Sequence, residues 1–262
     1  MTQIAPDGQE CLDGTRFLDW PSNSNKDAIA AGLQALMVWG MRVGVEFAEL
    51  FEDRQLSNDC KAAEKKLVKA ASKVYKKFLA SCPAPDAPGS KQVTALMTIT
   101  GLIDAPKADK EFLSINGAQG FSTFYGYYML EAMAMAGNYQ GALDVIREYW
   151  GAMIDLGATS FWEDFDINWI PNAAPIDELV PEGKKDIHGD CGAYCYVGFR
   201  HSLCHGWASG PTSWLSRHIL GVEVIEPGCR QVRITPHLGD LQWVKGTFPT
   251  PYGLSLIHIS EP

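Results

Sequence analysis

Apolar residues recur at three- and four-residue steps through much of the first 156 residues, and this spacing constrains the fold more than any other feature. Ser24 or Asn25 can cap a helix that extends to about Asp53. Further helices are expected over about 58–80, 92–101, 121–137 and 140–156, separated by short turns containing Gly, Pro or Asn. Helix, short turn and helix in succession predict a mainly α fold made of helical hairpins.

The first two helices are both predicted to be amphipathic. The buried stripe of the first is expected to comprise Ile29, Leu33, Leu36, Gly40, Val43, Phe47 and Leu50. Ser57 or Asn58 is expected to cap the second helix, whose outer face carries Lys61, Lys65, Lys69, Lys73 and Lys76. A row of lysines can bind an anion, but we interpret it as a solvated helix face.

The periodicity changes in the last third of the chain. A long irregular segment over 161–192 is rich in Pro, Asp and Trp, and so long a loop in a compact domain is usually functional. A last helix is expected over about 205–220. After Gly221 the segments 231–235 and 241–248 alternate between apolar and polar residues, with Val232 and Ile234 inward, which predicts strands of a small β domain.

Composition narrows the class of protein. The chain has 262 residues, is 46% hydrophobic and carries a net charge of -9, so it can bury a core and lacks the basic footprint of a nucleic-acid binder. No apolar run is expected to approach the ~20 residues that span a bilayer, and no signal peptide is visible. The seven scattered cysteines complete no zinc site and favour free thiols, so we predict no metal and no cofactor.

The segment 157–166 concentrates the candidate chemistry. It places Trp162 directly before Glu163, with Asp164 and Asp166 following, just after a helix ends. A carboxylate beside an aromatic ring is typical of a sugar subsite, and glycoside hydrolysis requires two carboxyl groups. Glu163 is therefore the candidate catalytic carboxylate. The alternative is an acidic surface loop that caps the next segment.

Other candidate residues lie on loops before helices. In 201–210, His205 can hydrogen-bond a hydroxyl and Trp207 can stack on a sugar, although a structural cap is equally compatible. Asp19 and Trp20 precede the first long helix and are candidates for the same cleft. Further candidates for the aromatic wall, each of which can equally be a core residue, are Trp169, Tyr125 and Tyr128.

In combination these segments resemble bacterial α-L-rhamnosidases of glycoside hydrolase family 78. The resemblance covers about residues 10–253 and is carried by 17–22, 159–163, 200–212, 220–222, 226–228, 236–241 and 246–253. It implies an (α/α)6 six-hairpin barrel over 1–221 followed by the start of a C-terminal β-sandwich over 222–253. It also implies inverting hydrolysis of terminal α-L-rhamnosides, with Glu163 as general base and His205 contacting the sugar.

The resemblance also implies parts that are missing. The general acid of the family lies in an Arg- and Asp-rich motif that is not found here, and the helical segments are fewer than six hairpins require. We therefore expect an incomplete barrel that is inactive by itself. The alternatives are another six-hairpin glycosidase, such as a fucosidase or trehalase-like enzyme, and a non-catalytic carbohydrate-binding helical toroid.

The last residues, 254–262, require separate treatment. Their sequence, Leu-Ser-Leu-Ile-His-Ile-Ser-Glu-Pro, is identical to the translation of a common sequencing-library adapter. We expect this tail to be non-native and the coding sequence to be interrupted near Gly253. The oligomeric state and the cellular compartment are not indicated by the sequence.

Overall fold

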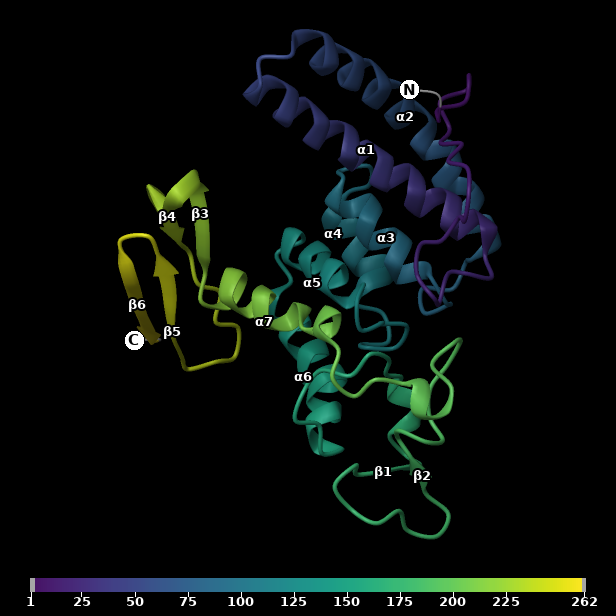
Figure 1. Ribbon diagram of the computed structural model, residues 1–262, viewed down its shortest axis with the longest axis vertical. Helices are drawn as coiled ribbons and strands as arrows, with labels where there is room; N and C mark the ends of the chain where they lie inside the picture. The colour runs from purple at the N-terminus through teal and green to yellow at the C-terminus, as the bar shows by residue number, and fades with distance from the viewer. Residues whose placement is uncertain (1–2, 261–262) are drawn as a thin grey trace. The chain divides into compact units, whose positions relative to one another are not determined.

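The computed structural model describes residues 3–260 and divides into two compact units, unit 1 (Met1–Ile115) and unit 2 (Asn116–Pro262). Helices dominate, and the strands form only small two-stranded sheets (Figure 1). The mainly α fold with a small β region that the sequence predicts is therefore confirmed. The predicted boundary at residue 221 stays a prediction.

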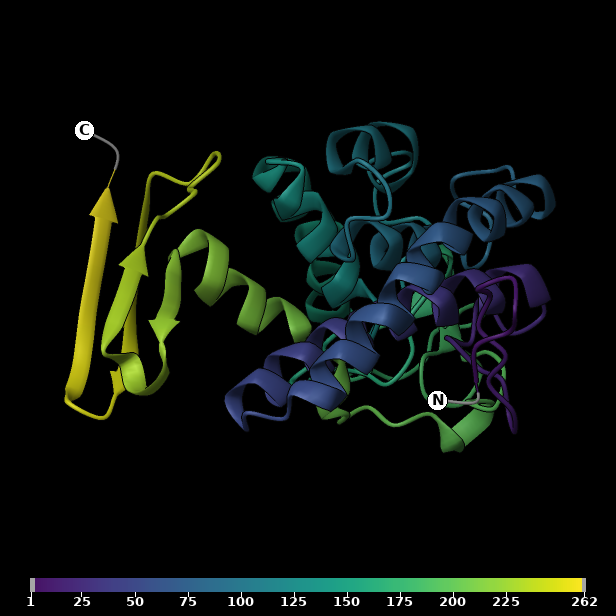
Figure 2. The same ribbon diagram turned by 90° about the horizontal axis from the view of Figure 1, so that it is seen from above.

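Unit 1 is organised by a pair of long helices, α1 (Lys26–Leu50) and α2 (Arg54–Ser81), that pack along each other (Figures 1 and 2). Shorter helices follow: α3 (Ser90–Ile99), α4 (Ala105–Ala108) and a π-turn, η1 (Asp109–Leu113). Asn25 caps α1 as predicted, since its side chain accepts hydrogen bonds from Asp27 N and Ala28 N. Asp53, which the sequence did not single out, caps α2 through Leu56 N at 2.9 Å.

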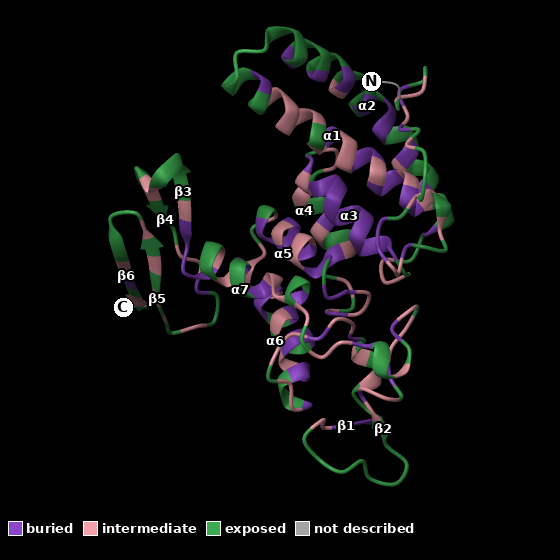
Figure 3. Cartoon of the chain, viewed as in Figure 1, coloured by how far each residue is buried: buried purple, intermediate pink, exposed green. Residues whose placement is uncertain are grey.

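The buried face of α1 differs from the predicted stripe. Of the predicted stripe only Ile29 is buried, whereas Phe47 and Leu50 are exposed. The buried face consists mainly of small residues: Ala28, Ala31, Gly32, Ala35 and Ala48. Small side chains allow two helix backbones to approach closely, and periodicity alone does not distinguish such a face from one of larger apolar residues. Figure 3 shows the exposed end of this hairpin.

Helix α1 also corrects the expectation that no segment could span a bilayer. By length and composition alone it could do so, with a mean hydropathy of 1.4 over 18 residues. No charged residue lies between Asp27 and Arg42. Glycines and Gln34 interrupt the apolar residues there, so the segment does not stand out as one apolar run. Buried helices of water-soluble proteins meet the same criterion. In α1 the buried amide of Gln34 donates to Leu67 O of α2 at 2.8 Å and to Gly8 O at 3.1 Å.

Unit 2 begins with the helical hairpin of α5 (Gly126–Met135) and α6 (Tyr139–Asp155). The predicted helix over 121–137 starts five residues late, and 121–125 form a turn that leaves Phe124 partly exposed. The long segment after α6 is irregular, as predicted, and contains the two-residue strands β1 (Ala173–Ala174) and β2 (Lys185–Asp186). Its short helical turns are η2 (Ile167–Trp169), η3 (Gly198–Arg200) and η4 (Gly206–Ala208).

The last helix of unit 2 is shorter than predicted. It comprises α7 (Gly210–Trp214) and the π-turn η5 (Leu215–Ile219), with Pro211 in the first turn. Pro lacks a backbone N–H and is therefore favoured where a helix starts. His205 consequently lies in extended backbone before the helix, with φ of -134°.

Two antiparallel hairpins follow η5. One pairs β3 (Val222–Glu226) with β4 (Gln231–Ile234) across the 3-10 turn η6 (Pro227–Cys229), and the other pairs β5 (Trp243–Thr250) with β6 (Gly253–Ser260). Leu220, Val222 and Ile257 form a small buried cluster that Val232, Val244, Phe248 and Ile259 surround. Ile234, predicted to point inward, is 45% exposed, because so small a β region buries few side chains.

The predicted adapter-encoded tail is therefore structured as far as residue 260. Residues 254–260 form most of β6, which pairs with β5 without a break in register and buries Ile257 while Leu254 and Leu256 stay exposed. Residues 261–262 lie outside the described residues. The non-native origin of the tail stays a prediction.

The observed start of α2 can be tested by removing its cap. Asp53→Ala is expected to lower the free energy of unfolding by ~1 kcal/mol, because Leu56 N loses its acceptor. Asn58→Ala, at one of the positions that the sequence suggested as a cap, is the matched control and should change it by less than ~0.5 kcal/mol. Urea denaturation followed by circular dichroism measures both. A larger effect at Asn58 would place the start of α2 near that residue instead.

Candidate functional site

Glu163 is paired with Ser202, thirty-nine residues further along the chain, by two hydrogen bonds. Glu163 N donates to Ser202 O at 2.9 Å, and Ser202 N donates to Glu163 Oε2 at 2.9 Å. The carbonyl of Glu163 also accepts from Thr123 Oγ1 at 2.6 Å. The backbone and one carboxylate oxygen are thus fixed by segments that come from different parts of unit 2.

The second carboxylate oxygen of Glu163 faces His205. The distance from Glu163 Oε1 to His205 Nδ1 is 3.8 Å, and 14% of the Glu163 side chain and 33% of the His205 side chain are exposed. His205 is itself held by its backbone N, which donates to Phe161 O at 2.8 Å. Ser160 Oγ donates to Leu203 O at 2.6 Å. The segments 160–163 and 202–205 therefore lie side by side and present one carboxylate oxygen and one imidazole together.

Trp207 and Phe124 form an aromatic pair beside Glu163. Their rings are stacked with centroids 5.4 Å apart and an interplanar angle of 27°, and they are 40% and 38% exposed. Trp207 Nε1 donates to Glu163 O at 3.4 Å, so the pair is tied to the carboxylate segment. His205 lies edge-on to Trp207 at 4.6 Å. A partly open aromatic surface next to a carboxylate and an imidazole matches the amphipathic character of a sugar.

His201 lies on the inner side of the carboxylate segment. It is fully buried, and its Nε2 accepts a hydrogen bond from Asp164 N at 3.1 Å, so the ring is neutral with its proton on Nδ1. Burial lowers the pKa of His201, against the opposing effect of the charge of Glu163. The neighbouring Trp169 ring lies edge-on to the imidazole at 6.0 Å.

Two of the predicted substrate-contacting tryptophans have different surroundings. Trp162 is fully buried and lies edge-on to Phe165 at 5.8 Å, so its ring has no face open to a ligand in this structure. Burial in the core explains why an apolar residue is needed at this position. Trp169 is only partly buried, and its ring contacts both Phe165 and His201. It therefore packs against the segment that carries Glu163.

The carboxylates that follow Glu163 in the sequence, Asp164 and Asp166, each accept a hydrogen bond from a backbone N–H. Asp164 Oδ2 accepts from Ala193 N at 3.2 Å. Asp166 Oδ1 accepts from Asn168 N at 2.9 Å and caps η2. Both therefore shape the irregular segment.

Asp19 and Trp20 belong to unit 1. Asp19 is buried in a turn in which its Oδ1 accepts from Trp20 N at 3.0 Å and its backbone exchanges hydrogen bonds with the hydroxyl of Ser22. The ring of Trp20 contacts Phe17 at 5.0 Å. Their part in a site with Glu163 stays a prediction.

Thr123 and Phe124 are residues that the sequence did not single out for the site. Both lie in 121–125, which periodicity assigned to a helix. The signal that could have found them is the Ser122-Thr123 pair, since hydroxyl side chains favour turns and helix starts over helix interiors. Tyr125 and Tyr128 contact the ring of Phe124 and extend the aromatic cluster inward.

Within residues 3–260, no group of three or more His, Cys, Asp or Glu side chains could hold a metal ion. All seven cysteines are free.

Known proteins supply one informative comparison. No protein-family model matches the chain, and no curated protein matches it. Among solved structures, the chain is similar to the crystal structure of the GH78 family rhamnosidase of Bacillus sp. GL1, with a TM-score of 0.69 and 22% sequence identity. The alignment covers 98% of this chain and 26% of that protein. At this identity the similarity shows a shared fold, and the chain spans about a quarter of the length of the enzyme.

The burial of His201 predicts a dependence of stability on pH. The unfolded state takes up a proton near the ordinary value of 6.5, whereas the folded state, with its lowered pKa, does not. Stability should therefore be constant above that value and fall as the pH drops below it. In His201→Gln this loss should be smaller, while the amide oxygen can still accept from Asp164 N.

The matched control is His258→Gln, at an exposed position on β6. Thermal unfolding measured between pH 7.5 and 5 compares the three proteins. An equal loss of stability in wild type and His201→Gln would mean that His201 does not titrate differently in the two states.

Proposed function

We propose that this chain carries part of the active site of a glycoside hydrolase that acts on terminal α-L-rhamnosides. The observation that carries the proposal is the position of Glu163, which is held through one carboxylate oxygen while the other faces His205 beside the Trp207–Phe124 pair. The shared fold with a GH78 family rhamnosidase supports the substrate class. The motif resemblance of 159–163 and 200–212 supports it independently.

In the proposed mechanism Glu163 acts as general base. Its carboxylate takes a proton from a water molecule as that water attacks the anomeric carbon, and the C1–O bond to the leaving group breaks with inversion. A second carboxyl group protonates the leaving oxygen, and in inverting enzymes it stands ~6.5–9.5 Å from the base. We propose that residues 1–262 do not supply this acid, because its family motif is not found among them.

The neighbouring residues have defined parts in this proposal. Ser202 N fixes the direction in which the carboxylate of Glu163 points, and the Thr123 hydroxyl fixes the backbone carbonyl of Glu163. His205 hydrogen-bonds a sugar hydroxyl, and Trp207 offers a ring face to the apolar side of the sugar or its aglycone. Such fixed placement contributes to rate because little reorganisation is needed when the substrate binds.

The test uses a full-length protein that contains this chain. Glu163→Gln should reduce kcat for 4-nitrophenyl α-L-rhamnoside by roughly 10²–10⁴-fold, the usual contribution of a general base. Asp166→Asn, which keeps an exposed acceptor for Asn168 N, is the control and should retain most of the activity. Near-normal turnover by Glu163→Gln would remove Glu163 from the mechanism.

Product stereochemistry separates a base from a merely structural residue. Proton NMR during hydrolysis should show β-L-rhamnose first, since inversion converts the α substrate to the β product. Added azide should restore turnover to Glu163→Ala with a β-rhamnosyl azide as product, because azide needs no deprotonation. Retained configuration would exclude the inverting mechanism, and hydrolysis of fucosides or glucosides in preference would favour the alternative glycosidases.

A further inference from the structure

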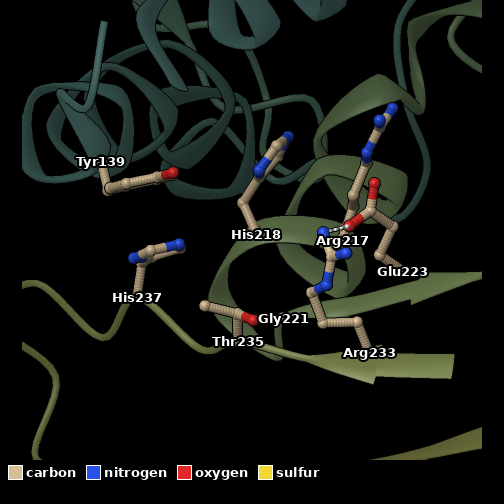
Figure 4. Close-up of a pocket in the computed structure, with 8 residues that line it drawn as sticks. All are labelled: Tyr139, Arg217, His218, Gly221, Glu223, Arg233, Thr235 and His237. Atoms are coloured by element: carbon tan, nitrogen blue, oxygen red, sulfur yellow. Dashed lines mark hydrogen bonds and ion pairs between the residues drawn. The ribbon is translucent and has the colours of Figure 1, made fainter. Parts of the chain in front are cut away.

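A pocket of unit 2 lies where the helical turn η5 meets the first β-hairpin (Figure 4). It encloses about 240 Å³. Its polar lining comes from α6, η5, β3, β4 and the segment after β4 and consists of Tyr139, Arg217, His218, Glu223, Arg233 and His237, here called the Arg-His pocket. None of these residues takes part in holding Glu163.

The lining of the Arg-His pocket is cationic. The lining residues carry two arginines and one carboxylate, Glu223, a charge of +1 (2 − 1) with both imidazoles neutral, and Glu131 beside Arg217 and His218 offsets this charge from outside the lining. The whole chain carries -9. Guanidinium, imidazole and phenol groups all donate hydrogen bonds, and donors gathered in one concave site suit an oxyanion.

Each arginine of the pocket forms an ion pair with a carboxylate that engages only part of its guanidinium group. Arg233 pairs across the hairpin with Glu223 at 3.1 Å, and Arg217 lies 3.6 Å from Glu131. Their side chains are 62% and 50% exposed. A guanidinium has five N–H donors in a planar fork, so an ion pair at one nitrogen leaves donors for a second acceptor.

The imidazoles complete the opposite side of the Arg-His pocket. The Tyr139 and His237 rings are stacked 3.7 Å apart, and Figure 4 shows both side chains entering from the side opposite Arg233. His218 Nε2 is 3.0 Å from Glu131 Oε1, and His237 N donates to His218 O at 3.1 Å. Burial, together with His218, lowers the pKa of His237, which a bound anion would oppose.

The backbone makes this arrangement rigid. Gly221 has φ of +79°, and Thr235 N donates to its carbonyl at 2.8 Å. A Cβ at position 221 would lie 2.2 Å from the carbonyl carbon of Thr235. Only glycine allows so close an approach, which brings η5 against the hairpin that carries Arg233.

We propose that the Arg-His pocket binds a phosphate group, either as free phosphate or as part of a phosphorylated small molecule. Arg217 and Arg233 contact it from one side and the Tyr139 hydroxyl and His237 from the other, with His218 between them. Donors from several directions match a tetrahedral dianion. The volume also accommodates part of the molecule that carries the phosphate.

The proposal is tested on the 262-residue chain by titration with inorganic phosphate at constant ionic strength. Two-dimensional NMR of the histidine rings should show saturable shifts of His218 and His237. Arg217→Gln and Arg233→Gln should each weaken the affinity by roughly tenfold, since each removes a charge-assisted hydrogen bond. Arg200→Gln, at an exposed position outside the pocket, is the matched control and should bind as wild type.

A parallel titration with a sugar phosphate distinguishes the two sources. Tighter binding than that of inorganic phosphate would identify a phosphorylated molecule as the ligand, and equal affinity would identify free phosphate. Shifts that do not saturate, or that sodium chloride reproduces, would overturn the proposal. Wild-type affinity in the folded Arg217→Gln and Arg233→Gln variants would overturn it as well, and unfolding curves verify that these variants are folded.

Discussion

The reciprocal hydrogen bonding of Glu163 with Ser202 is the constraint on which the candidate site depends. It uses the backbone N–H of Glu163 and one of its carboxylate oxygens, so it fixes the chain and the side chain at the same time. A carboxylate that accepts a backbone N–H keeps one defined orientation without the entropy of a free side chain. The oxygen that remains is the one that faces His205.

Around this pair, polar side-chain groups hold a loop that has almost no regular secondary structure. The Thr123 hydroxyl and Trp207 indole both donate to the carbonyl of Glu163, and the neutral His201 accepts from the next residue. Each satisfies a backbone group that a long loop would otherwise leave without a partner. The same contacts bring the aromatic rings of Phe124 and Trp207 together, so the supports of the loop also shape the surface offered to a ligand.

The sequence predicts the α character of the chain, because three- and four-residue periodicity directly reflects helix geometry. It also identifies Glu163, His205 and Trp207 as neighbours through motif resemblance. It misses what depends on contacts distant in the chain. Small residues form the buried face of α1, and Trp162 is buried although it adjoins the candidate base. Asp53 is a local cap that starts α2 earlier than the sequence suggested. Thr123 joins the site only because a predicted helix begins late.

The account's central claim is that Glu163 points its free oxygen at a bound sugar. The most direct measurement is a crystal structure, with L-rhamnose, of a protein that contains this chain. The sugar should lie between His205 and Trp207, with a carboxylate oxygen of Glu163 about 3 Å from the anomeric hydroxyl or from a water beside C1. A rhamnose bound elsewhere, with the carboxylate of Glu163 facing away from it, would contradict the claim.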